Sequence, residues 1–67
     1  MKLRKGNIVT LNPNSGKIKN RIREHGGEWI IKDIRDTIQI GTVLLESRKD
    51  PDYWIWVERK DIKEVLE

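Results

Sequence analysis

Apolar residues along the chain fall into short blocks that are separated by clusters of turn-forming residues. Within most blocks apolar and polar positions alternate, which is the pattern of a β-strand with one buried face. This pattern predicts strands over residues 5–11, 28–34, 37–46, 53–58 and 63–66. The connections are predicted as a loop that begins at residue 12, a turn at 35–36, a hairpin connection at 47–52 and a single helical turn at 59–62. Gly41 lies inside the third predicted strand and marks a bulge or bend there.

The period changes in the long connection between the first two strands. Ile18 and Ile22 are four residues apart, and Gly26 with Gly27 supplies a stop signal, so a helix of two to three turns is predicted over residues 15–25. A helix this short is marginal in water. We therefore expect it to lean on the body of the domain.

The fourth predicted strand is apolar on both faces, because Tyr53, Ile55 and Val57 alternate with two tryptophans, Trp54 and Trp56. Two interpretations follow. In the first, the tryptophans are exposed and form a stacking platform for nucleobases or an anchor for a protein. In the second, the 15–25 helix covers them with its two isoleucines. The sequence favours the covered arrangement, and it places Trp29 in the core.

The chain resembles SH3-like barrels, including bacterial and phage KOW-like domains. Residues 5–11 are similar to the Gly-Asp-x-Val type of first strand in that superfamily, and residues 53–65 to its last hairpin strand, one-turn 3₁₀ helix and closing strand. The resemblance implies a mainly β fold: a single domain over residues 1–67 that forms a five-stranded barrel with a short helix in the first long loop. The predicted helix replaces the acidic, proline-binding loop of eukaryotic SH3 domains, so binding of PxxP peptides is not implied. Size and composition look like those of phage or mobile-element accessory proteins.

Composition narrows the setting and the class of partner. The chain has no cysteine, which favours a cytoplasmic protein without disulfides, and we expect neither a signal peptide nor a membrane span. Residues 1–25 carry seven bases and one acid, whereas residues 26–67 carry seven bases and ten acids. The basic N-terminal third steers an anionic partner, or it keeps a small protein in solution.

Catalytic chemistry is not predicted. His25 is the single histidine, and its place at a helix C-terminus is favourable for structural reasons. The carboxylates are scattered, Asp50 and Asp52 lack the further ligands of a calcium loop, and Gly16-Lys17 lacks the spacing of a phosphate loop. We expect no enzyme activity, metal, cofactor or small-molecule substrate.

Two binding hypotheses remain, and the sequence favours the first. In the first, nucleic acid or another anion contacts the basic side chains of the N-terminal third with aromatic help from Trp54 and Trp56; these bases are Arg4, Lys5, Lys17, Lys19, Arg21 and Arg23. In the second, a phage-type or mobile-element factor docks on a host or defence protein through the tryptophan face or a strand edge. Homo-oligomerisation through the same face is a third interpretation.

Overall fold

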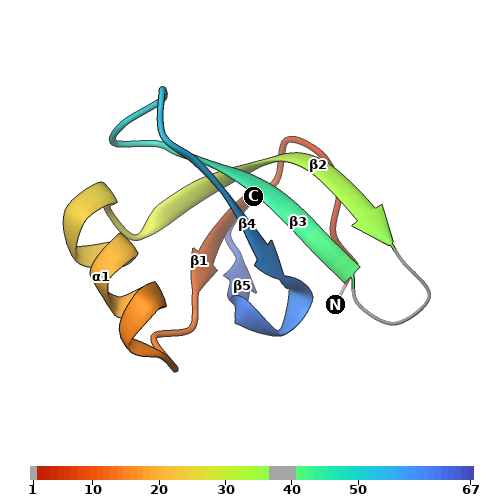
Figure 1. The fold of residues 1–67 in the computed structure, drawn as a ribbon. Coiled ribbons are helices and arrows are strands. Elements are labelled where there is room, and N and C mark those ends of the chain that lie inside the picture. The colour runs from red at the N-terminus through yellow and green to blue at the C-terminus, as the bar shows by residue number, and fades with distance from the viewer. Residues whose placement is uncertain (1, 37–40) are drawn as a thin grey trace.

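The computed structural model describes residues 2–36 and 41–67 and is mainly β, as predicted. Its elements in chain order are β1 (Ile8–Leu11), α1 (Gly16–His25), β2 (Glu28–Asp36), β3 (Gly41–Ser47), β4 (Trp54–Glu58), the 3₁₀ turn η1 (Arg59–Asp61) and β5 (Ile62–Val65). The five strands form one antiparallel sheet in the order β4-β3-β2-β1-β5. In Figure 1, α1 lies beside one end of this sheet, and the N-terminus lies toward the other end.

The core lies on one side of the curved sheet. β1, β2 and β3 each contribute two side chains to it from alternate positions, as the period-two pattern predicts, β4 and β5 contribute one each, and α1 contributes Ile18. The core residues are Leu3, Val9, Leu11, Ile18, Trp29, Ile31, Val43, Leu45, Val57 and Ile62. The opposite side of the sheet, here called the outer face, has no layer packed on it among the described residues.

β2 carries one extra residue, which changes the face on which its later side chains lie. Ile31 pairs with Leu45, and Asp33 pairs with Leu44, so Lys32 has no residue opposite it in β3. Such a bulge bends the strand and reverses the alternation beyond it. The sheet therefore does contain a bulge, but the bulge lies in β2.

The bulge brings Ile34 opposite Val43, and Ile34 packs against the core. The bulge predicted at Gly41 is wrong, because Gly41 pairs with Asp36 in regular register. The turn predicted at residues 35–36 is also wrong, because Arg35 and Asp36 continue β2. The start of the predicted third strand, residues 37–40, lies outside the described residues.

The sheet is open. β4 and β5 form its two edges, and no ladder joins them within residues 2–36 and 41–67. At one end the edges are linked by η1, whose capping box joins the side chains of Glu58 and Asp61 to each other's backbone N–H groups. Asn12 Nδ2 donates to the carbonyls of Lys60 and Ile62 at 3.1 and 3.3 Å, so the loop after β1 also holds this link. The predicted one-turn helix is confirmed here.

The predicted helix over residues 15–25 is confirmed as α1. Ser15 is its N-cap, and the Ser15 hydroxyl accepts from the Ile18 N–H at 3.3 Å. Gly26 ends the helix with φ 90°, a conformation that favours glycine, and its N–H donates to the Ile22 carbonyl at 2.9 Å. Ile18 is buried and Ile22 is partly buried against the core, so α1 leans on the sheet as expected.

Adjacent leucines on β3 test which side of the sheet holds the core. Leu45 is fully buried and Leu44 is half-buried on the outer face. Leu45→Ala should lower the free energy of unfolding by about 2–5 kcal/mol, and Leu44→Ala by about 1 kcal/mol. Urea denaturation followed by tryptophan fluorescence measures both values. Equal losses would mean that the outer face is also packed.

Candidate binding surfaces

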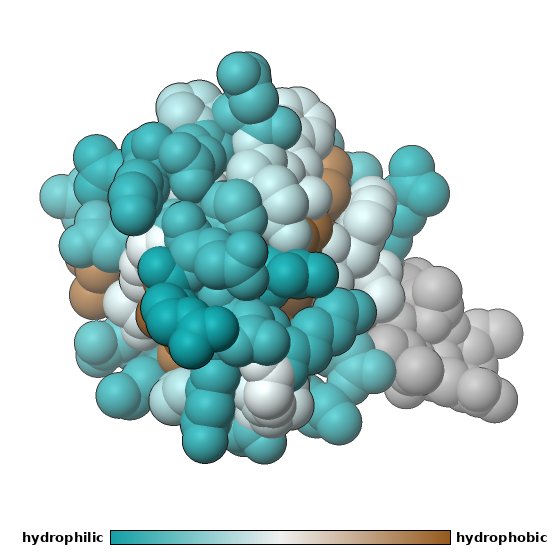
Figure 2. Space-filling view, turned by 60° about the vertical axis from the view of Figure 1, so that its left-hand side comes forward, coloured by the Kyte–Doolittle hydropathy of each residue, from teal (hydrophilic) through white to brown (hydrophobic). Residues whose placement is uncertain are grey.

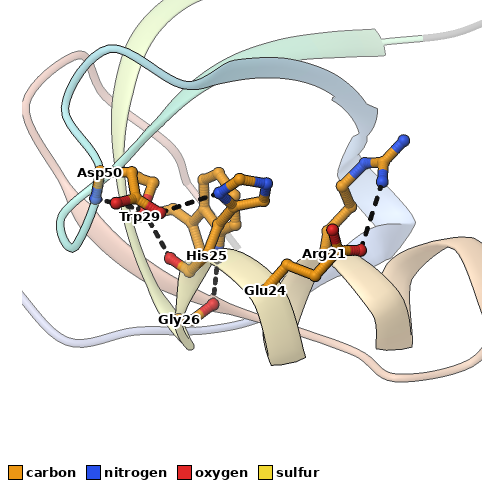
Figure 3. Close-up of polar contacts among 7 residues, drawn as sticks. Arg21, Glu24, His25, Gly26, Trp29 and Asp50 are labelled. Atoms are coloured by element: carbon orange, nitrogen blue, oxygen red, sulfur yellow. Dashed lines mark hydrogen bonds and ion pairs between the residues drawn. The ribbon is translucent and has the colours of Figure 1, made fainter.

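His25, the last residue of α1, has a structural role. Its imidazole stacks on the Tyr53 ring with centroids 3.6 Å apart and an interplanar angle of 7°, and its Nδ1 lies 2.9 Å from Asp50 Oδ2 (Figure 3). Ser47 Oγ donates to the His25 carbonyl and accepts from the Asp50 N–H. These contacts tie the end of α1 to the β3–β4 connection.

No metal-binding arrangement occurs in the part of the chain that the structure describes. Its acidic side chains and His25 nowhere form a group of three or more that could hold a metal ion. The Asp50 carboxylate is engaged with His25 instead of completing a calcium loop.

Trp54 and Trp56 lie on the outer face, with 50% and 46% of their surface exposed. They stand opposite Glu46 and Leu44 of β3, on the side of the sheet away from the core. The prediction that the 15–25 helix covers them is wrong, because α1 packs on the core side. Trp29 is fully buried, and its core position is confirmed.

Basic side chains of β2 lie over both exposed rings. Lys32 Nζ is 5.7 Å from the centroid of the Trp54 ring, and Arg35 Cζ is 5.3 Å from that of Trp56, which is within the range of a cation–π contact. The Trp54 indole N–H also donates to Glu46 Oε1 at 3.1 Å. We call Lys32, Arg35, Leu44, Trp54 and Trp56 the tryptophan face. Sequence reasoning missed Lys32 and Arg35, and Arg35 reaches the outer face only because of the bulge.

The charges around the tryptophan face are paired. Lys32 Nζ lies 3.9 Å from Glu46 Oε1, and Arg35 Nε lies 3.5 Å from Asp33 Oδ2. Asp33 Oδ1 is also 3.6 Å from Lys5 Nζ. Exposed pairs of this kind contribute little to stability. They do reduce the net positive potential that a nucleic-acid backbone would meet at the rings.

The six bases predicted as an anion surface are divided by the fold. Lys17, Lys19, Arg21 and Arg23 are on α1. Lys5 pairs instead with Asp33 of β2, and Arg4 precedes Lys5 in the N-terminal segment. Figure 1 shows the N-terminus at the end of the sheet away from α1. On α1, Arg21 Nη1 is 3.9 Å from Glu24 Oε1, and Arg23 donates to Asn20 Oδ1. Among the described residues Lys17 and Lys19 have no ion-pair partner.

A groove of about 750 Å³ runs between α1 and the edge strand β4. Its α1 side includes Lys17, Ile18 and Arg21. Its other side consists of Thr42, Tyr53, Ile55, Trp56, Val57, Glu58, Lys60 and Asp61. Figure 2 turns the α1 side of the molecule toward the viewer and shows mainly hydrophilic residues, with apolar ones visible between them. The groove, which the sequence did not predict, borders the tryptophan face at Trp56.

A scan of protein-family models and searches of curated proteins and of solved structures found no match to this chain. In residues 2–36 and 41–67 the single α-helix is ten residues long, and no helix there has the length and apolarity needed to cross a bilayer.

Fluorescence quenching distinguishes the three tryptophans. The double variant Trp54→Phe/Trp56→Phe keeps only Trp29, which has no exposed surface. Its emission should be blue-shifted and its quenching by acrylamide weak, whereas Trp29→Phe should leave a red-shifted, strongly quenched emission from the exposed pair. Stern–Volmer constants measured on the folded variants check this. Similar constants would contradict the placement of the pair on the outer face.

Ser47 tests how α1 is held. Its buried hydroxyl bonds both the His25 carbonyl and the Asp50 N–H, so Ser47→Ala should lower the free energy of unfolding by about 1–3 kcal/mol. Thr42→Val is a matched control, because the Thr42 hydroxyl donates to the Arg35 carbonyl in an exposed position on the same strand. Its effect should be within about 0.5 kcal/mol of zero. Urea titrations compare the two, and a larger loss for the control would contradict the role of Ser47.

Proposed function

We propose that the chain is a non-enzymatic macromolecule-binding module whose partner is a protein, docked at the tryptophan face. The observation that carries this proposal is the exposure of Trp54 and Trp56 side by side on an edge strand. Large rigid aromatic side chains that are half exposed on a folded surface are typical anchors of protein interfaces. The domain has a small core and yet leaves these two large apolar side chains half exposed, which supports a role for them in binding a partner.

The charge pattern supports a protein over a nucleic acid at this face. Basic and acidic side chains alternate around the rings and pair with one another, as Lys32 does with Glu46 and Arg35 with Asp33. An interface with protein has such a mixed polar rim. A surface that binds nucleic acid needs basic side chains without ion-pair partners, which displace counterions from the phosphates.

The fold proposed for the module is of the SH3-like kind, with the barrel left open between the edge strands β4 and β5 of the described residues. Support comes from the order of elements, in which a long loop containing α1 separates β1 from the β2–β3–β4 meander, and η1 leads into β5. Pairing of β1 with both β2 and β5 is the connectivity expected of such a barrel. Fold alone does not indicate function, so the binding proposal depends on the tryptophan face.

Nucleic acid is the second candidate, and a separate observation favours it. Lys17 and Lys19 are exposed on α1 without ion-pair partners among the described residues, and Arg23 is exposed on the same helix. These side chains offer basic groups for phosphates along α1. The proposed site is then centred on α1, because Trp54 and Trp56 stand on the outer face and only Trp56 of the two also lines the groove beside α1.

Affinity capture with matched variants distinguishes the two candidates. The immobilised wild-type chain, Trp54→Ala/Trp56→Ala and Lys17→Gln/Lys19→Gln are each incubated with lysate of the source cells, with and without nuclease, and bound proteins are quantified by mass spectrometry. We expect a partner that resists nuclease, is reduced at least about tenfold by the tryptophan variant and is retained by the lysine variant.

Circular dichroism must show that both variants keep the fold, and the captured partner is then titrated in purified form. Loss of all association after nuclease treatment, together with oligonucleotide binding that weakens steeply with salt and is reduced by the lysine variant, would instead establish the second candidate. Retention of the partner by the tryptophan variant would refute docking at the tryptophan face.

A further inference from the structure

β4 has a free hydrogen-bonding edge along the groove. The Ser47 N–H donates to the Tyr53 carbonyl at 3.0 Å, and this bond sets which residues of the hairpin exchange hydrogen bonds. By alternation, the backbone groups of Ile55 and Val57 point toward β3, whereas those of Trp54 and Trp56 point away from the sheet. No other hydrogen bond of the described residues uses the backbone of Trp54 or Trp56. A free edge of this kind pairs with an added strand.

The groove gives an added strand two different sides. Toward α1 its floor is apolar, since Ile18, Tyr53 and Ile55 line it. Trp56 also lines it, and this ring belongs to the tryptophan face on the outer side. Side chains of a strand alternate between two faces. Alternate residues of a strand paired with β4 would therefore meet α1 and the tryptophan rings in turn.

The side chains that line the groove carry a net positive charge, because Lys17, Arg21 and Lys60 outnumber Glu58 and Asp61. Glu58 and Asp61 bond each other's backbone in the capping box of η1, and Lys60 Nζ lies 3.2 Å from Glu58 Oε2. Lys17, on the α1 side, has no such partner among the described residues. Arg21 beside it lies 5.9 Å from the Tyr53 ring centroid, and its nearby acid, Glu24, is exposed on α1. Charge complementarity thus favours acidic side chains facing α1.

We propose that the groove between α1 and β4 binds an extended, acidic segment of a partner protein, which adds to the sheet as a strand beside β4. The proposal rests on the proposed function, because it names the part of the protein partner that docks there. Residues opposite Trp54 and Trp56 exchange backbone hydrogen bonds with them and are apolar. The intervening residues are acidic and face Lys17 and Arg21.

The test uses synthetic peptides of about eight residues, close to the usual length of a strand. The probe alternates Val and Glu, and its matched control alternates Val and Lys. Titration into the isotope-labelled chain, followed by amide chemical shifts, detects even weak binding. We expect the Val–Glu peptide to bind and to slow hydrogen exchange at the amides of Trp54 and Trp56, without such slowing at Ile55 or Val57, whose amides already bond β3.

Backbone methylation of the probe tests strand addition directly. The Val residues lie opposite Trp54 and Trp56, so their N–H groups point toward β4, and N-methylation of Val should abolish binding. N-methylation of Glu should change the affinity less than about threefold, because those N–H groups point away from the sheet. Equal effects of the two methylations would overturn strand addition.

Adjacent lysines on α1 test the charge assignment. Lys17→Glu should weaken binding of the Val–Glu peptide about fivefold or more, the magnitude expected when one exposed ion pair becomes a repulsion. Lys19→Glu is the matched control, since it makes the same charge change on the same helix outside the residues that line the groove. Its effect should be less than twofold or so. Equal binding of Val–Lys and Val–Glu peptides would overturn the acidic partner.

The remaining outcomes separate this inference from the proposed function. If the Val–Glu peptide does not bind, the acidic strand is refuted, whereas the proposed function stands as long as the captured partner still depends on Trp54 and Trp56. If the Trp54 and Trp56 amides are protected at high concentration without peptide, and sedimentation shows a dimer, the occupant is a second copy of the chain. If an oligonucleotide displaces the peptide in a Lys17-dependent way, the groove is an anion site. Each of the last two results overturns the acidic strand.

Discussion

Trp29 has no exposed surface, and its indole N–H donates to the Gly26 carbonyl at 3.2 Å, at the point where α1 ends. The edge of its ring meets Tyr53, which in turn stacks on His25. One residue of β2 thus joins the sheet, the end of α1 and the start of β4. In a chain without cysteine, a core of this size depends on such shared contacts, because burial is its main source of stability. The position of α1 on the core side follows from this packing.

The outer face remains uncovered because the domain is small. A chain of 67 residues supplies one layer of core, and its only described α-helix is used to cover it. Trp54 and Trp56 therefore remain in contact with water on one side, with Lys32 and Arg35 lying over their rings. Burying such aromatic area against a partner gains free energy that the isolated domain does not obtain. The free edge of β4 adds directional hydrogen bonds at the same place, so apolar anchors and backbone pairing support the same binding proposal.

The bulge at Lys32 shows why much of the candidate site was not predictable from the pattern of residues. Uninterrupted alternation would place Lys32 beside Ile30, and Arg35 on the opposite face. With the extra residue, Arg35 reaches Trp56 while Ile34 turns toward the core. The pattern of apolar and polar residues in β2 does not indicate the bulge. A bulge disrupts the hydrogen bonds between two strands only locally, and tertiary packing compensates for this disruption. The positions of the basic side chains were also not predictable. Lys5 and Lys17 belong to the same basic segment of the sequence, but β1 lies between them, so Lys5 and the α1 residue Lys17 lie in different parts of the fold.

Local patterns were sufficient for the type and order of the elements. The strands β1 and β4, the helix over residues 15–25 with its Gly26 stop, and the burial of Trp29 all follow from short stretches of sequence, because strand propensity, helix termination and hydrophobicity act over a few residues. Local patterns were not sufficient to predict which side of the sheet α1 covers. Both faces of β4 are apolar, so the helix could pack on either of them. Packing between distant segments, above all Ile18 and Tyr53 with Trp29, decides between the two faces. The groove, the exposed tryptophans and the division of the charges exist only once those segments meet.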